Sequence, residues 1–231
     1  MGTHETRLSQ QRRKFEVMYQ ELRTRICLLD YVPGQRLSEE RLADEFGVSR
    51  TPLRRVLGRL ESEGLLRSVQ SVGTIVTDVD IGELGQTYQL RMELAELIGR
   101  LSPATVTPEL TDRFRDLLRQ CDDLAGKPDS RRFAQINMDF LHVLLDLTEN
   151  EPLRQISELL YYKTTRIWIK SIGLMDLAEE IKIFRRELAD ALAAVEIGDL
   201  EAVGHIRRSH ISMSFTRLRR STEQADVPAT V

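Results

Sequence analysis

The segment from Ser38 to Gly64 limits the fold of this chain more than any other part of its sequence. Two acids follow Ser38 and open a short helical stretch over 39–46, after which residues 47–49 have the composition of a tight turn. A further helix then begins with Pro52 in its first turn, where the missing backbone N–H costs nothing. Apolar residues recur along it at steps of three and four, which predicts one buried face: Leu53, Val56, Leu57 and Leu60. Two short helices joined by a tight turn are the parts of a helix-turn-helix.

The sequence on either side of this motif supplies the rest of a small domain. Residues 9–29 carry apolar side chains at helical spacing, which predicts an amphipathic helix ahead of the motif. The β-branched residues within 66–77 predict a two-stranded wing with Gly73 in its turn. We therefore predict a winged helix-turn-helix over residues 1–77.

The remainder of the chain has a helical pattern. Prolines and glycines divide it into about six predicted helices, at 81–101, 107–125, 129–148, 151–172, 175–197 and 199–221. The predicted fold class is mainly α, with an N-terminal winged helix-turn-helix and a short β-hairpin wing, followed by an all-α helical bundle. We expect a linker at 78–80, the all-helical domain at 81–222 and a disordered tail at 223–231.

Composition narrows the functional class only in part. The net charge of −3 gives no general attraction for nucleic acid, but residues 1–76 carry an excess of Lys and Arg, whereas the rest of the chain is acidic. Cys27 and Cys121 are far apart and predict free thiols in a reducing, cytoplasmic environment. No apolar run approaches the length of a membrane span, and the N-terminus lacks the apolar segment of a secretory signal.

The start of the second motif helix has the residue types that DNA reading requires. A recognition helix enters the major groove by its N-terminal end, where short hydroxyls reach phosphates and long donors reach base edges. Ser49 and Thr51 supply the hydroxyls, and Arg50 and Arg54 lie four residues apart on one helix face. The alternative interpretation is a capped helix start whose arginines are merely solvated.

Residues 33–66, PGQRLSEERLADEFGVSRTPLRRVLGRLESEGLL, resemble the DNA-binding domain of the GntR family of bacterial regulators. The resemblance implies that Arg50, Thr51 and Arg54 contact an operator. It also implies that Gly73 lies in the wing and that a homodimer binds short inverted repeats. Many members carry an arginine where this chain has Glu40. Either the adjacent Arg41 makes that operator contact instead, or the contact is lost in this chain.

Three later segments resemble the all-helical effector domain of the FadR-like branch, the FCD domain. They are YQLRMELAELIGRL at 88–101, INMDFLHVLLDLTENEPL at 136–153 and GDLEAVGHIRRSHI at 198–211. The resemblance implies that an aspartate, a histidine four residues later and two further histidines hold a divalent, zinc-type metal. The metal, or a carboxylate bound to it, would then be the sensed signal.

Transferred residue by residue, this metal-binding set is incomplete in the present chain. His142 and His210 occupy the first and last histidine positions. Met138 stands at the aspartate position, and Leu188 stands at the middle histidine. A zinc-type site needs at least three protein ligands, and neither a thioether nor an aliphatic group replaces a carboxylate.

Neighbouring residues leave two interpretations of this region open. Asp139 is three residues before His142, so Asp139, His142 and His210 together are one candidate metal site. Helical spacing predicts that Asn137 and His205 point away from it. We favour the other interpretation, in which the two histidines line a polar cavity that holds an effector without a metal.

Such an effector needs a polar anchor. Arg91 can clamp a carboxylate through two hydrogen bonds, or alternatively pair with a neighbouring glutamate on the surface. Arg166 is a second candidate anchor. Arg91 would suit a carboxylate, whereas Met138, Leu188 and Ile167 would make the cavity more apolar and favour a larger or less charged ligand.

Together these features favour a ligand-responsive transcriptional repressor. It would bind double-stranded DNA as a homodimer and be released or repositioned by an effector in the helical domain. The alternatives are a metal-dependent enzyme with a histidine site in a helical bundle, and an effector-free architectural DNA-binding protein. The sequence has no nucleophile–base pair at a characteristic spacing, no HExxH and no phosphate-binding glycine loop, so we expect no enzyme.

Overall fold

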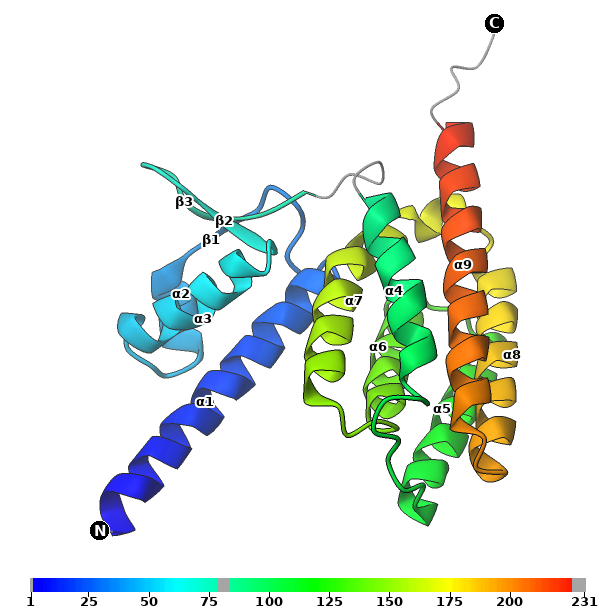
Figure 1. Ribbon diagram of the computed structural model, residues 1–231. Coiled ribbons are helices and arrows are strands. Elements are labelled where there is room, and N and C mark those ends of the chain that lie inside the picture. Colours follow the sequence, from blue (N-terminus) through cyan, green and yellow to red (C-terminus); the bar gives the residue numbers. More distant parts are fainter. Residues whose placement is uncertain (1, 79–83, 226–231) are drawn as a thin grey trace, which may run out of the picture. The chain divides into compact units, whose positions relative to one another are not determined.

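The computed structural model describes residues 2–78 and 84–225, and the chain divides into two units, residues 1–79 and 80–231 (Figure 1). Most of the predicted linker and the end of the predicted tail lie outside the described residues. Among the described residues, no helix is long and apolar enough to cross a membrane.

The first unit is the predicted winged helix-turn-helix. Its elements, in chain order, are α1 (Gly2–Cys27), β1 (Arg36–Leu37), α2 (Glu39–Glu45), α3 (Arg50–Ser62), β2 (Leu66–Val69) and β3 (Gly73–Val76). Helix α1 begins well before the predicted start. The two-residue strand β1 is an addition that the sequence did not indicate, because so short a strand carries no alternating pattern.

Local side-chain chemistry explains the ends of the motif helices. The Ser38 hydroxyl accepts a hydrogen bond from the Arg41 backbone N–H, so it caps α2 as predicted. Ser49 occupies the N-cap position of α3, but its hydroxyl makes no cap hydrogen bond. The apolar stripe of α3 is buried against α1, where Leu22 and Ile26 are fully covered. Burial of these side chains fixes which face of α3 remains outside.

The wing is a three-stranded antiparallel sheet with strand order β1-β3-β2. Arg36 on β1 and Arg67 on β2 both pair with Ile75 on β3. Contrary to the prediction, Gly73 does not lie within the turn; it is the first residue of β3, opposite Val69. Its φ of +111° is a conformation that side-chain-bearing residues rarely adopt, so glycine is needed where the chain re-enters the sheet.

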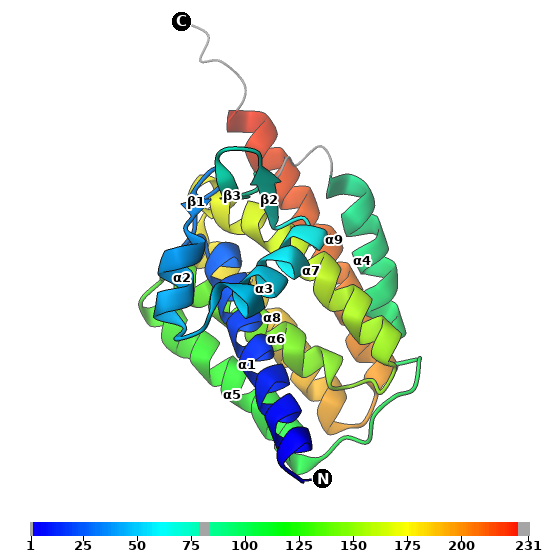
Figure 2. The same ribbon diagram turned by 90° about the vertical axis from the view of Figure 1, so that its left-hand side faces the viewer.

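The second unit is a bundle of helices. Its described elements are α4 (Gly85–Leu97), α5 (Pro108–Gly126), α6 (Ser130–Leu145), α7 (Glu151–Ser171), the 3₁₀ turn η2 (Ile172–Leu174), α8 (Leu177–Glu196) and α9 (Leu200–Ala225). The mainly α fold class is confirmed, and each predicted helix has its counterpart among these elements. Helix α9 continues to Ala225, into the segment predicted as a tail. Figure 2 shows the same helices from the side.

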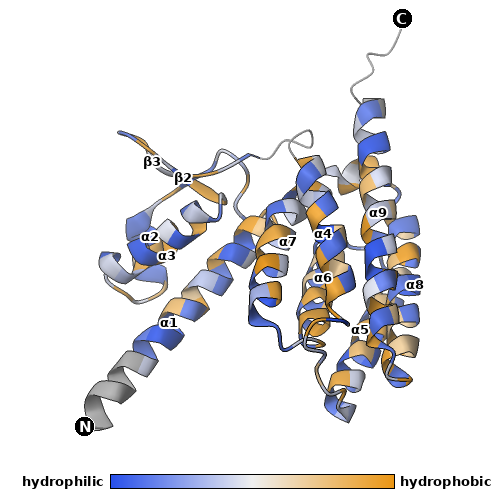
Figure 3. Cartoon of the chain, viewed as in Figure 1, coloured by the Kyte–Doolittle hydropathy of each residue, from blue (hydrophilic) through white to orange (hydrophobic). Residues whose placement is uncertain are grey.

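Caps and apolar faces explain why these helices form where they do. Side-chain oxygens at the N-cap positions of four helices accept backbone hydrogen bonds: Thr107, Asp129, Asn150 and Asp176. Each helix carries hydrophilic and hydrophobic residues together (Figure 3), as expected for helices with one face in a core. That core includes edge-to-face aromatic contacts of Phe184 with Phe133 and with Phe140.

Helices α4 and α9 lie side by side and approach closely (Figure 1). A Cβ atom on Gly99, just after α4, would overlap the Leu200 carbonyl oxygen. A Cβ atom on Gly204 would lie 3.0 Å from the Ala95 carbonyl oxygen. Glycine at these two positions therefore lets the two backbones come into contact.

Candidate functional site

The N-terminal end of α3 presents its polar side chains to solvent. Arg50 and Arg54 have side-chain exposures of 58% and 65%, and Ser49 and Thr51 are exposed beside them. Leu53, on the opposite face, is completely buried. The guanidinium groups therefore point outward and the leucines inward, which is the arrangement that groove reading requires.

Both arginines are held by carboxylates from the first turn of α2. Arg50 Nη2 lies 3.0 Å from Glu40 Oε1, and Arg54 Nε lies 2.8 Å from Glu39 Oε2. Exposed ion pairs of this kind contribute at most about 1 kcal/mol, so a phosphate or a guanine can displace the carboxylates. The pairs orient the guanidinium groups without burying them.

The wing adds basic groups that the sequence prediction missed. Arg36 and Arg67 flank Ile75 across the sheet, so both side chains lie on one face, and both are exposed. An ideal Cβ on Gly73 would lie 3.5 Å from Arg36 Nε, which places that guanidinium over the glycine. Arg41, on α2, is exposed as well. For Arg67, a basic residue within the predicted wing was the available signal, whereas Arg36 had none.

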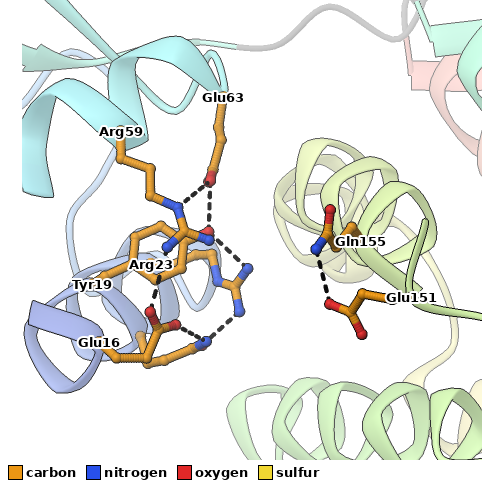
Figure 4. Close-up of polar contacts among 8 residues, drawn as sticks. Glu16, Tyr19, Arg23, Arg59, Glu63, Glu151 and Gln155 are labelled. Atoms are coloured by element: carbon orange, nitrogen blue, oxygen red, sulfur yellow. Dashed lines mark hydrogen bonds and ion pairs between the residues drawn. The ribbon is translucent and has the colours of Figure 1, made fainter. Parts of the chain in front are cut away.

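A polar cluster fastens α1 to the C-terminal end of α3 (Figure 4). The buried Tyr19 hydroxyl donates to Glu63 at 2.6 Å and accepts from Arg23 at 2.9 Å. The guanidinium of Arg59 stacks on the Tyr19 ring at 3.7 Å. Burial is the main reason that the pKa of Tyr19 is raised, so the hydroxyl stays a donor. This cluster fixes the orientation of the helix that carries Arg50 and Arg54.

The second unit contains a cavity of about 80 Å³. One water-sized group needs roughly 10–15 Å³, so the cavity holds several such groups. Its polar lining comes from α4, α6, α7, α8 and α9: Arg91, Asn137, Thr165, Glu180, Glu187, Arg207, His210, Ser214 and Arg217. Its apolar lining is largely aromatic: Tyr88, Phe133, Tyr161, Trp168 and Phe184, with Ile169, Ile183 and Ile211.

Arg91 differs from the other cations of this cavity in its partners. Its Nη1 donates to Thr164 Oγ1 at 2.6 Å, and its guanidinium lies over the rings of Tyr88 and Tyr161. No carboxylate among the described residues forms an ion pair with it. Burial and, in the same direction, the neighbouring Arg207 guanidinium lower the pKa of Arg91. A bound anion would relieve both penalties.

The other two arginines of the cavity are each neutralised. Arg207 Nη1 lies 2.6 Å from Glu187 Oε1, and both side chains are almost fully buried. Arg217 makes two hydrogen bonds to the carboxylate of Glu180, at 2.6 and 2.8 Å. His210 Nδ1 lies 3.8 Å from the second oxygen of Glu187.

Comparison with known proteins agrees with this architecture. Residues 15–76 match the gntR family of bacterial regulatory proteins, and residues 86–213, more than half of the chain, match the FCD domain. The chain belongs to the GntR family and carries an FCD domain.

Three relatives illustrate the match. The Nta operon transcriptional regulator of Aminobacter aminovorans is 33% identical over 130 residues, which is 54% of this chain and 61% of that protein. The gluconate operon transcriptional repressor of Bacillus licheniformis is 38% identical over 93 residues, 40% of this chain and 38% of the relative. The regulator McbR of Escherichia coli is 24% identical over 191 residues, 81% of this chain and 86% of the relative.

The solved structure of E. coli McbR superposes with a TM-score of 0.78 at 21% identity, covering 90% of this chain and 98% of that one. This likeness shows the shared fold. The chain spans less than two thirds of the length of the Nta operon regulator. All of these relatives are named as transcriptional regulators or repressors, and none of these names supports the alternative of an enzyme.

The structure of the GntR-family chain separates the two histidines that we predicted to share a site. His142 lines a different hollow of about 280 Å³ together with Asp139, and its Nε2 lies 3.2 Å from the Tyr162 hydroxyl and 3.4 Å from Glu158 Oε1. His210 lines the cavity that contains Arg91. Asp139, His142 and His210 therefore do not form one metal site.

The reason is a one-residue error in the expected helical register. Asn137, expected to point away, lines the cavity that contains Arg91, whereas His142, five residues later, does not. One residue turns a side chain by about 100° around a helix, so a shift of one position changes the face. The signal that marks Asn137 is its spacing from the cavity residues Phe133 and Ala134 on the same helix.

Three other predicted positions are now placed. Arg166 is almost fully buried on α7 but is not among the residues that line the cavity. Met138 and Leu188 are buried in the core. Among residues 2–78 and 84–225, no group of three or more His, Cys, Asp and Glu side chains is arranged to hold a metal ion. The residues present do not fit the metal that the family resemblance implies.

Proposed function

We propose that this regulator is a ligand-responsive repressor that acts in the cytoplasm, binds an inverted-repeat operator as a homodimer and changes its DNA affinity when an effector occupies the cavity. The observation that carries the ligand response is Arg91, a half-buried cation that pairs with no carboxylate of the described residues. An organic anion is the group that such a site lacks. A purely architectural DNA-binding protein would have no use for this unneutralised charge.

The DNA contacts follow from the exposed face of α3 and from the wing. We assign base contacts to Arg50 and Arg54, since arginine pairs with the O6 and N7 atoms of guanine. Ser49 and Thr51 are assigned to phosphates, because the Ser49 hydroxyl makes no cap hydrogen bond. Arg41 and the wing at Gly73, with Arg36 and Arg67 beside it, are assigned to the DNA backbone.

Repression is supported by the name of one relative, the gluconate operon transcriptional repressor.

The homodimer is supported by the family resemblance and by the single recognition helix of the described chain, since a two-fold pair of such helices reads an inverted repeat. A sedimentation experiment with the protein on its selected DNA should give two chains per duplex. One chain per duplex would contradict the dimer.

The DNA-reading assignment is tested with duplexes selected from a random pool by the purified protein. Arg50→Ala and Arg54→Ala should each weaken binding to the selected duplex by about 1–3 kcal/mol, since each removes one base contact. Arg119→Ala is the matched control, because Arg119 is similarly exposed and also pairs with a carboxylate, but on α5 of the other unit. Unchanged affinity in both Arg50 and Arg54 variants, measured by fluorescence anisotropy, would remove α3 from the recognition role.

A further inference from the structure

The charges inside the cavity do not balance. Its described lining holds the guanidinium groups of Arg91, Arg207 and Arg217 but only the carboxylates of Glu180 and Glu187. Because Arg207 and Arg217 each bind one carboxylate, the excess positive charge resides on Arg91. The described lining is therefore short of one negative charge.

We infer, on the basis of the proposed function, that this effector site works without a metal ion and takes a small organic acid with one carboxylate and an apolar body. In this inference the Arg207 guanidinium, and not a metal ion, supplies the positive charge beside Glu187 and His210. The ligand carboxylate binds Arg91, and the ligand body lies against the aromatic wall.

The first step is the position of Arg207. Its guanidinium lies 2.6 Å from Glu187 Oε1, and the other oxygen of Glu187 lies 3.8 Å from His210 Nδ1. A divalent metal bound to Glu187 and His210 would stand next to a guanidinium whose side chain is only 10% exposed. Two neighbouring cations in a poorly solvated site repel strongly, so Arg207 competes directly with a metal for the same carboxylate.

The second step is the loss of the remaining ligands. His142 faces another hollow, and Met138 and Leu188 are packed in the apolar core. The helix α6 offers the cavity the neutral amide of Asn137 in place of a carboxylate. Glu180 is bound by Arg217, and no three His, Cys, Asp or Glu side chains of the described residues are arranged to hold a divalent cation.

The third step concerns the ligand. One unneutralised arginine matches one carboxylate, whereas a di- or tricarboxylate would bring surplus negative charge near Glu180 and Glu187. The rings of Tyr88 and Tyr161 flank the Arg91 guanidinium, and the packed rings of Phe133, Trp168 and Phe184 line the same cavity. An apolar group beside the carboxylate would bury its surface there, and the volume of about 80 Å³ restricts it to a small molecule.

The test is a thermal-shift titration of the full-length protein with benzoate, phenylacetate and isovalerate, with citrate and malonate, and with the neutral benzamide, each with and without EDTA. At least one monocarboxylate should raise the melting temperature equally in both conditions, since ligand binding stabilises by RT ln(1 + [L]/Kd). Benzamide and the polycarboxylates should give no shift. Metal analysis of the purified protein should find far less than one zinc, manganese or nickel ion per chain.

Arg91→Gln isolates the anchor. This variant should lose the shift given by the monocarboxylate while keeping or raising the melting temperature of the free protein, because it removes a poorly solvated, unneutralised charge. Arg100→Gln, an exposed arginine soon after α4, is the control and should keep the shift. Loss of melting temperature in Arg91→Gln would contradict the unneutralised charge.

Four outcomes overturn the inference: one metal per chain, a shift that EDTA removes and zinc restores, a larger shift with citrate than with any monocarboxylate, or no shift with any of the three monocarboxylates. None of these touches DNA reading, which stands or falls with the Arg50 and Arg54 variants. A metal-dependent shift with citrate would leave the proposed ligand response intact and remove only the metal-free site.

Discussion

At the scale of single residues, the reading face of α3 contains its own competitors. Glu40 and Glu39 hold the guanidinium groups of Arg50 and Arg54 while DNA is absent. The same carboxylates must part from them when a phosphate or a base arrives. If Arg50 contacts DNA as proposed, Glu40 opposes binding to any duplex and favours only those sequences whose contacts with Arg50 outweigh the loss of the ion pair.

Glu40→Gln should therefore bind DNA more tightly and less selectively. Removing the carboxylate frees Arg50 and abolishes repulsion from phosphates, so affinity for unselected duplex should rise on the order of tenfold at low salt. The measurement is fluorescence anisotropy on selected and scrambled duplexes at salt concentrations from about 50 to 200 mM, over which each phosphate contact adds a slope of roughly one to the logarithmic salt dependence of the affinity. Glu45→Gln is the control, because Glu45 also lies on α2 but pairs with Arg25. Weaker binding of Glu40→Gln to every duplex would show instead that the orientation Glu40 gives to Arg50 assists DNA binding.

At the scale of elements, the contact between α4 and α9 is the tightest constraint in the second unit. The backbone after α4 meets the start of α9 at Gly99 without room for a methyl group. Arg91 on α4 and the cavity residues Arg207 and His210 on α9 are therefore carried by two helices in fixed relation. Packing at Gly99 thus constrains the geometry of a cavity that Gly99 itself does not line.

Gly99→Ala should destabilise the second unit by about 1–3 kcal/mol or more, because its Cβ would meet the Leu200 carbonyl oxygen and force the backbones apart. Urea unfolding followed by circular dichroism measures the change. Gly126→Ala is the control, since a Cβ there meets nothing within 4 Å. Equal stability of the Gly99→Ala variant and the natural protein would contradict the close approach.

The elements themselves and the buried face of α3 were largely predictable from the sequence, but the direction in which the side chains of α6 point was not. Caps such as Ser38 and Thr107, and prolines in first turns, locate helix starts through local chemistry alone. Which side of α6 lines the cavity depends on how this helix packs against its neighbours. An error of one residue in the expected helical register led us to place His142 in the cavity, where the structure has Asn137. Arg36 escaped prediction because β1 exists only through its pairing with β3.

At the scale of the whole molecule, DNA reading and ligand binding are assigned to separate units. The assigned DNA-contact residues lie between Arg36 and Gly73, and the residues that line the cavity lie between Tyr88 and Arg217. Each unit has its own buried core, and Cys27 and Cys121 are buried one in each. The two cores can therefore be followed separately in unfolding experiments.

The stability of the second unit should depend on pH in part through the ionisation of Cys121. Burial raises the pKa of its thiol from 9.0 to about 11. The folded state thus disfavours the thiolate, so the stabilisation is complete below pH 9 and is lost as the pH rises through 11. Relative to Cys121→Ala, the natural protein should lose melting temperature more steeply between pH 9 and 11. Parallel curves for the two proteins would refute the shift.

The absence of a methyl group at Gly99 has a mechanical consequence for signalling. Two helices whose main chains touch resist separate movement, so a molecule that displaces α4 through Arg91 should move α9 with it. Ligand binding in the cavity would then be transmitted as a joint motion of α4 and α9 rather than as increased flexibility of one helix.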